Sequence, residues 1–207
     1  TKTLKLSPIT KIQDIKPFSV IDIETKQWTE FIVLGFYNGE TYLEFRTLAE
    51  FVNYIEGNTD YLSRDFYAHF GGKFDFNFLL NEFIQNPKAE LLRIVPRGSM
   101  ILCFDVVIGG ATFTFNDSSA LLSFSLKKLT DQFDVETKKG EWDHEKTTGW
   151  TPELSEYLKA DCIGLYQVLL KFWSQDIIRQ AGPAKTMASQ ALRVFRTYLK
   201  KDLWALT

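Results

Sequence analysis

The segment from residue 18 to residue 25 reads Phe-Ser-Val-Ile-Asp-Ile-Glu-Thr, an apolar and β-branched run that predicts a buried strand. Because side chains alternate between the two faces of a strand, Asp22 and Glu24 point the same way, and the neighbouring isoleucines point the other way. Burying two carboxylates is unfavourable unless something compensates, and hard divalent cations prefer carboxylate oxygens. At a strand end, however, the pair can simply be solvated. The metal interpretation therefore depends on partners elsewhere in the chain.

Length and composition are typical of one large globular domain: 207 residues, of which 45% are hydrophobic and 15% aromatic, with 18 phenylalanines. The formal net charge of −2 argues against binding a polyanion through overall charge. Any nucleic-acid contact must therefore be local and must tolerate carboxylates. Cys103, in a strand-like run, and Cys162, in a helical one, predict reduced structural thiols and an intracellular protein. No zinc-ligand spacing occurs.

The chain shows no apolar run near the ~20 residues that a membrane span needs, and no signal-peptide hydrophobic region follows its start. We expect a soluble protein.

Alternating and continuous apolar runs predict an α/β domain in which three early strands are antiparallel neighbours. The expected strands are 18–25, 30–37, 40–45, 66–70, 91–95, 101–108 and 111–115. Asn38-Gly39 and Gly109-Gly110 lie where hairpins are expected. The expected helices are 47–57, 75–86, 121–133, 151–173 and 184–199. We expect a loose lead at 1–17, a turn at 116–119 and a charged loop at 134–149.

Two further acids stand in unusual positions. Asp75 opens a helix directly after the Gly71-Gly72 break, and Asp161 lies in the helix 151–173 four residues after Tyr157, so that both side chains share one helical face. Singly, each has an ordinary structural explanation: a helix-initiating acid, a solvated acid and a half-buried phenol. Together with Asp-x-Glu on the first strand they form an ordered and far more specific set.

This set closely resembles the 3′–5′ proofreading exonuclease domain of protein-primed family B DNA polymerases, from about residue 18 to 173. Asp22 to Thr25 is similar to the first exonuclease motif, His69 to Asp75 to the second, and Tyr157 to Asp161 to the third. Ser118 with Leu122 resembles the Ser/Thr-Leu-x-x-apolar motif of this subfamily, and residues 139–142 its Lys-x-x-apolar motif.

The sequence departs from the family pattern at three positions. Phe70 stands where the second motif normally has an Asn that contacts the single-stranded primer end. Ser119 replaces the usual Leu, and His144 stands where an aromatic hydroxyl is expected to contact DNA. All four carboxylates and Tyr157 are nevertheless present.

The resemblance implies an α/β, ribonuclease H-like fold of the DEDDy exonuclease type, with a mixed central sheet flanked by helices. It also implies phosphodiester hydrolysis with two divalent ions, Mg²⁺ or Mn²⁺. Asp22 is the expected bridging ligand, Glu24 and Asp161 are expected at the ion that binds the attacking water, and Asp75 at the second ion. Tyr157 is expected to orient the nucleophile.

Lys139 has two interpretations of equal weight: stabilisation of charge on the scissile phosphate, or a solvated loop lysine. The candidate substrate contacts are Thr25, His69, Phe70, Phe74, Phe78 and Ser118, with the rings stacking on or wedging between unpaired bases. Phe74 and Phe78 are equally compatible with the core.

The expected partners are a single-stranded DNA 3′ end, a polymerase domain and a terminal protein primer, with no membrane. The resemblance also implies a location in the cytoplasm of a host cell, or in a nucleus or mitochondrion if the protein is the product of a virus or linear plasmid. We expect residues 1–183 to form the exonuclease domain and 184–207 to contain a helix leading toward a polymerase palm domain that lies outside this sequence. Two alternatives stay open: a catalytically weak nuclease-like module that binds single-stranded nucleic acid, and a free-standing exonuclease acting on DNA or RNA.

Overall fold

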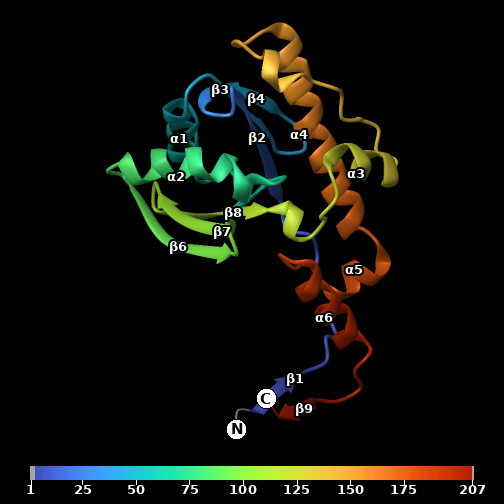
Figure 1. Ribbon diagram of the computed structural model, residues 1–207. Helices are drawn as coiled ribbons and strands as arrows, with labels where there is room; N and C mark the ends of the chain where they lie inside the picture. The colour runs from blue at the N-terminus through green and yellow to red at the C-terminus, as the bar shows by residue number, and fades with distance from the viewer. Residues whose placement is uncertain (1–2, 207) are drawn as a thin grey trace.

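The computed structural model describes residues 3–206 and is organised around one mixed sheet of seven strands (Figure 1). In chain order these strands are β2 (Phe18–Lys26), β3 (Glu30–Tyr37), β4 (Tyr42–Phe45), β5 (Asp65–Ala68), β6 (Ala89–Arg97), β7 (Met100–Ile108) and β8 (Ala111–Asp117). Across the sheet their order is β4-β3-β2-β5-β8-β7-β6. Strands β2, β5 and β8 are parallel, and β3, β4, β7 and β6 pair antiparallel with their neighbours. This is the α/β, ribonuclease H-like arrangement that the sequence predicted.

Helices cover both faces of the sheet (Figure 1). Helices α1 (Leu48–Gly57) and α2 (Asp75–Gln85) pack on one face, in a cluster that includes Ile21 and Ile23 of β2. Helices α3 (Leu126–Gln132) and α4 (Pro152–Trp173) pack on the other, in a cluster that includes Phe18 and Val20. Strand β2 is central and covered on both faces, which explains why its sequence is apolar almost throughout.

Local sequence signals account for where several helices begin. Thr47 and Glu50 form a reciprocal capping box at α1. The Thr151 hydroxyl accepts a hydrogen bond from the Leu154 N–H, and Pro152 occupies the first turn of α4. These helices start where the sequence predicted.

The structure corrects several expected boundaries. Strand β5 ends at Ala68, not at residue 70, because the backbone turns left-handed at Phe70. The predicted helix 121–133 is helical only over α3: residues 118–120 form a short 3₁₀ turn, and Ser125 caps the helix through the Lys128 N–H. Strand β4 starts at Tyr42 and not at residue 40, and β6 is longer than the predicted strand 91–95. The predicted charged loop, 134–149, contains a 3₁₀ turn at His144–Lys146.

Residues 3–17, the described part of the lead, also differ from the loose segment expected. Strand β1 (Thr3–Leu6) pairs antiparallel with β9 (Leu203–Leu206), at the far end of an extension that contains α5 (Asp176–Ala181) and α6 (Met187–Thr197) (Figure 1). The Arg196 Nε donates to the Ser7 carbonyl at 2.7 Å, which ties the lead to α6. Helix α6 is shorter than the predicted helix 184–199, and helix α5 was not predicted. Among residues 3–206, no helix is long and apolar enough to cross a membrane.

Candidate active site

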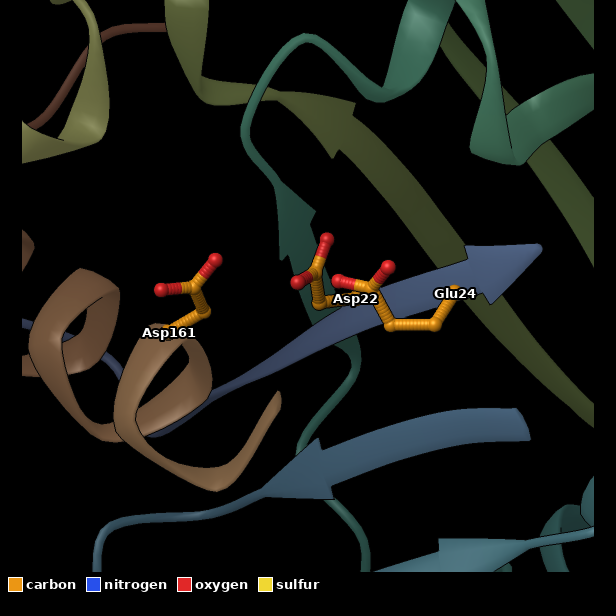
Figure 2. A group of neighbouring side chains, drawn as sticks. All are labelled: Asp22, Glu24 and Asp161. Atoms are coloured by element: carbon orange, nitrogen blue, oxygen red, sulfur yellow. The ribbon is translucent and has the colours of Figure 1, made fainter. Parts of the chain in front are cut away.

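Two carboxylates of β2 and one of α4 converge on a single point. Figure 2 shows Asp22 and Glu24 projecting from the strand toward Asp161 on the helix. One carboxylate oxygen of each lies within 4.8 Å of the others. The alternation of β2 places Asp22 and Glu24 on the face that α4 covers, as the sequence predicted. Three anionic groups at this separation repel one another unless a cation or protons intervene.

The converging carboxylates open onto a cavity of about 190 Å³. Ten of the residues predicted to form the site line it: Asp22, Glu24, Thr25, His69, Phe70, Phe74, Asp75, Lys139, Tyr157 and Asp161. Phe78 and Ser118 do not. Phe78 packs against Phe74 with ring centroids 5.4 Å apart, so its contact with the cavity is indirect. The cavity also includes Trp28, which the sequence did not single out.

Asp75 reaches the same cavity from the first turn of α2. Its Oδ1 accepts a hydrogen bond of 2.8 Å from the Ile23 N–H, between the two acidic residues of β2. Burial, together with the Glu24 charge, raises the pKa of Asp75 to about 7 against the opposing effect of its backbone hydrogen bonds. The fourth carboxylate is thus anchored to the strand that carries the first two.

The electrostatics of this cluster favour a bound cation. Burial raises the pKa of Asp22 well above its usual range, and the charges of Asp75 and Glu24 add to the shift. Within residues 3–206, the buried Oδ1 of Asp161 has no hydrogen-bond partner. An unsatisfied buried acceptor among repelling carboxylates, all with hard oxygen donors, fits Mg²⁺ or Mn²⁺.

Lys139 lies inside the site. Its ammonium contacts Asp161 Oδ2 and lies 4.5 Å from the centre of the Tyr157 ring. Burial opposes protonation, but the charges of Asp161 and Asp22 outweigh it and raise the pKa of Lys139. The side chain is 24% exposed and its ammonium pairs with Asp161, so Lys139 is not freely solvated here, and its role on the scissile phosphate stays a prediction. In this conformation Asp161 forms its ion pair with the ammonium of Lys139.

Tyr157 stands one helical turn before Asp161 and is buried. Burial, reinforced by the Asp161 charge, raises the pKa of the Tyr157 phenol well above its usual range. The phenol therefore keeps its proton at neutral pH and can donate a hydrogen bond into the cavity. Trp142 packs against its ring at 5.6 Å.

Gly35 determines how closely α4 approaches β2. It is the register partner of Asp22, and a Cβ built on it would lie 2.8 Å from Leu158 Cγ and 2.9 Å from Cys162 Sγ. Leu158 and Cys162 flank Asp161 in sequence. The absence of a side chain at Gly35 lets α4 bring Asp161 close to β2, and only the packing of the helix on the sheet reveals this.

A buried network holds the segment between β5 and α2. Asp117 accepts hydrogen bonds from the N–H groups of Gly72 and Ser119, at 3.1 and 2.8 Å. His69 Nδ1 lies 2.9 Å from Ser118 Oγ, and its Nε2 lies 2.7 Å from the Phe124 carbonyl. Burial lowers the pKa of His69, so the neutral ring links these segments. The sequence indicated only a polar turn around Asp117.

Phe70 occupies an unusual backbone conformation at the cavity wall. Its φ of 60° and ψ of 18° are left-handed, a region that asparagine adopts more readily than phenylalanine. Its ring lies 4.7 Å from that of His69 and is half-buried. Phe70 is therefore neither part of β5 nor enclosed in the core.

The sequence is similar to known DNA polymerases. Residues 55–151 match the family described as DNA polymerase type B, organellar and viral. The DNA-directed DNA polymerase of Enterobacteria phage PRD1 is 27% identical over 171 residues, which are 81% of this chain and 27% of that polymerase. The chain thus spans about a quarter of the length of the relative it matches.

Solved polymerases share the fold. Phi29 DNA polymerase complexed with single-stranded DNA superposes with a TM-score of 0.70 and 21% identity, over 86% of this chain and 34% of that one. The family B DNA polymerase of the archaeon Pyrobaculum calidifontis gives a TM-score of 0.57 and 13% identity, over 89% of this chain and 28% of that one. In sequence and in fold, the chain resembles the protein-primed family B DNA polymerases, which confirms the resemblance that its motifs predicted.

Proposed function

We propose that this chain is a 3′–5′ exonuclease that hydrolyses single-stranded DNA ends, and that it is the proofreading part of a protein-primed family B DNA polymerase. The observation that carries the proposal is the convergence of Asp22, Glu24 and Asp161 on one point, with Asp75 in the same cavity. The resemblance to viral DNA polymerases in sequence supports the same activity.

The four carboxylates would hold two divalent ions. Asp22 is proposed as the ligand shared by both, Glu24 and Asp161 as further ligands of one, and Asp75 as a ligand of the other. When bound, such ions polarise the scissile phosphate and hold the attacking and leaving oxygens. The orphaned oxygen of Asp161 and the raised pKa of Asp22 support cation binding at this cluster.

The other side chains of the cavity would orient and stabilise the reacting groups. Tyr157, which keeps its proton, donates a hydrogen bond that orients the attacking water and does not act as a base. Lys139 carries a full positive charge beside Asp161, within reach of negative charge developing on the phosphate.

The substrate would enter past the uncharged wall of the cavity. Thr25, Phe70 and Phe74 are proposed to contact the unpaired end, with the rings stacking on bases. His69 and Ser118, which bond to each other, would hold this wall in place, and Phe78 would support Phe74.

The proposal also covers the domain bounds, a further partner and the location of the protein. Residues 1–183 would form the exonuclease domain, and 184–207 would lead toward a polymerase palm domain outside this sequence. A terminal protein primer would be a further partner of the complete polymerase. We propose an intracellular location, consistent with the two buried free thiols, Cys103 and Cys162.

The test is Mg²⁺-dependent degradation of a 5′-labelled single-stranded oligonucleotide, followed on a denaturing gel. Asp22→Ala and Asp161→Ala should lower the rate by orders of magnitude, because each removes a metal ligand. Asp60→Ala, which removes an exposed carboxylate outside the cavity, is the matched control. Equal rates for the parent and Asp22→Ala would contradict the proposal, as would shortening of the labelled strand from its 5′ end.

One observation favours a second function, a module that binds single strands and cleaves them slowly. Phe70 stands in the cavity where the family pattern has asparagine, and a phenyl ring can stack but cannot hydrogen-bond. Calorimetric titration of Mg²⁺ with oligonucleotide present, followed by single-turnover cleavage, separates the two functions. Tight binding of both, with only slow formation of product in a single turnover, would favour the binding module.

A further inference from the structure

Trp28 lies at the rim of the acidic cavity and takes no part in the mechanism above. It lines the cavity, yet it is 57% exposed. Its ring centroid lies 5.8 Å from that of Phe74, at an interplanar angle of 80°, and 5.1 Å from that of His144, at 35°. Three rings contributed by distant segments of the chain thus meet beside the carboxylates.

The backbone at Trp28 is one that tryptophan rarely adopts. Gln27 and Trp28, with φ of 50° and 62°, are the central residues of the turn between β2 and β3, which the Thr29 N–H closes on the Lys26 carbonyl at 3.2 Å. Two consecutive left-handed residues favour Asn, Asp or Gly. Burial does not compensate, because over half of Trp28 is exposed. Residues held in sparsely populated conformations cluster at functional sites.

The charge of the site explains why an aromatic surface is needed there. Four carboxylates face the cavity, and the chain as a whole carries a net charge of −2, so attraction to phosphates contributes little to holding a nucleic-acid strand. Stacking of unpaired bases on aromatic rings does not depend on charge and tolerates any base sequence. An exposed indole beside the carboxylates supplies such a surface.

We propose that Trp28 is the stacking platform for an unpaired base at the 3′ end of the single-stranded substrate, and that Phe74 and His144 hold its ring in place. This inference rests on the proposed function and names a substrate-binding residue for it. The left-handed turn presents the ring at the cavity rim.

The test compares three variants. Trp28→Asn removes the ring and suits the left-handed turn, so it keeps the fold, which thermal melting checks. Trp28→Tyr retains a stacking surface. Trp150→Ala removes another partly exposed indole that lies outside the cavity lining and is hydrogen-bonded to Glu44, and it is the matched control.

Binding is measured by fluorescence anisotropy of a 5′-labelled oligothymidylate in EDTA, and cleavage by steady-state kinetics with Mg²⁺. Trp28→Asn should raise Kd and KM about tenfold or more and change kcat less, since stacking acts on the bound ground state. Trp28→Tyr should recover most of the affinity, and Trp150→Ala should match the parent.

An abasic scan of the last three nucleotides identifies the contact. At one position, loss of the base should weaken binding to the parent several-fold more than binding to Trp28→Asn. If the parent binds and cleaves while Trp28→Asn matches it in Kd and KM, or if no position discriminates the two proteins, the inference about Trp28 is wrong and the nuclease proposal stands. If the parent neither binds nor cleaves the oligonucleotide, both are wrong.

Discussion

Gly35 faces Asp22 across the β2–β3 ladder, and the space left by its missing side chain is filled by Leu158 and Cys162 of α4. The distance between strand and helix at this point fixes how closely the carboxylates of Asp22 and Asp161 approach. A residue without chemical function thus controls the geometry of the acidic cluster.

We therefore expect Gly35→Ala to displace α4, because the new methyl group would come within 3 Å of Leu158 and Cys162. Overpacking of this kind typically costs ~1–3 kcal/mol, and moving Asp161 should lower the cleavage rate at least tenfold. Differential scanning calorimetry and the gel assay measure the two effects. Gly57→Ala is the control, since a Cβ there meets nothing within 4 Å. Parental melting and cleavage by Gly35→Ala would refute the role of Gly35.

Asp22 and Asp161 should respond differently to neutralisation. Asp22→Asn removes a buried charge that is repelled by its neighbours, so it should raise the melting temperature of the metal-free protein at pH 7. Burial raises the pKa of Asp161 as well, but Asp161→Asn also leaves the half-buried Lys139 ammonium without its anionic partner and should lower the free energy of unfolding by about 1–3 kcal/mol. Urea unfolding in EDTA gives both values. A loss of stability for both variants would show that repulsion does not dominate at Asp22.

The metal-free protein should become less stable as the pH rises. The folded-state pKa values of Asp22 and Asp75 are raised, Asp75 to about 7 from an ordinary value of 3.8, so the folded state binds more protons than the unfolded state between these values. Stability is then fully present below pH ~4 and is lost as the pH rises through the folded-state pKa values. Urea midpoints from pH 4 to 8 should fall in EDTA.

Mg²⁺ provides the control for this pH dependence. Cations bound to the ionised carboxylates stabilise the folded state most at high pH, so saturating Mg²⁺ should flatten or reverse the slope. Asp22→Asn should also reduce the slope in EDTA. A slope that neither Mg²⁺ nor this substitution changes would assign it to groups outside the cluster.

Phe70→Asn should relieve the strained backbone at residue 70 and raise the cleavage rate. Asparagine tolerates the left-handed conformation of residue 70, and relief of that conformation is worth ~1 kcal/mol. Its amide can hydrogen-bond to the substrate, which should raise kcat more than it changes Kd. Calorimetry and single-turnover cleavage measure the two effects. A slower or unchanged cleavage rate would show that residue 70 does not align the substrate. Reduced stability would show that the ring contacts of Phe70 outweigh its backbone strain.

The sequence by itself determined the strand and helices that carry the acidic cluster, and the chemistry of that cluster. The two-residue alternation of β2 put Asp22 and Glu24 on one face, and the four-residue spacing in α4 put Tyr157 and Asp161 on another. Local signals located both, because strand periodicity, helix caps and helix spacing are properties of neighbouring residues. The motif order then indicated that Asp75 belongs with them.

Only the tertiary structure decided how these faces meet. The need for a glycine at Gly35 arises from packing against residues more than a hundred positions away. The contact of Lys139 with Asp161 and the exposed ring of Trp28 at the cavity rim likewise depend on segments brought together by folding. The pairing of β1 with β9 joins the two ends of the described chain. Such contacts leave no local periodicity, since the residues involved are separated by whole elements and meet only when the sheet and helices pack.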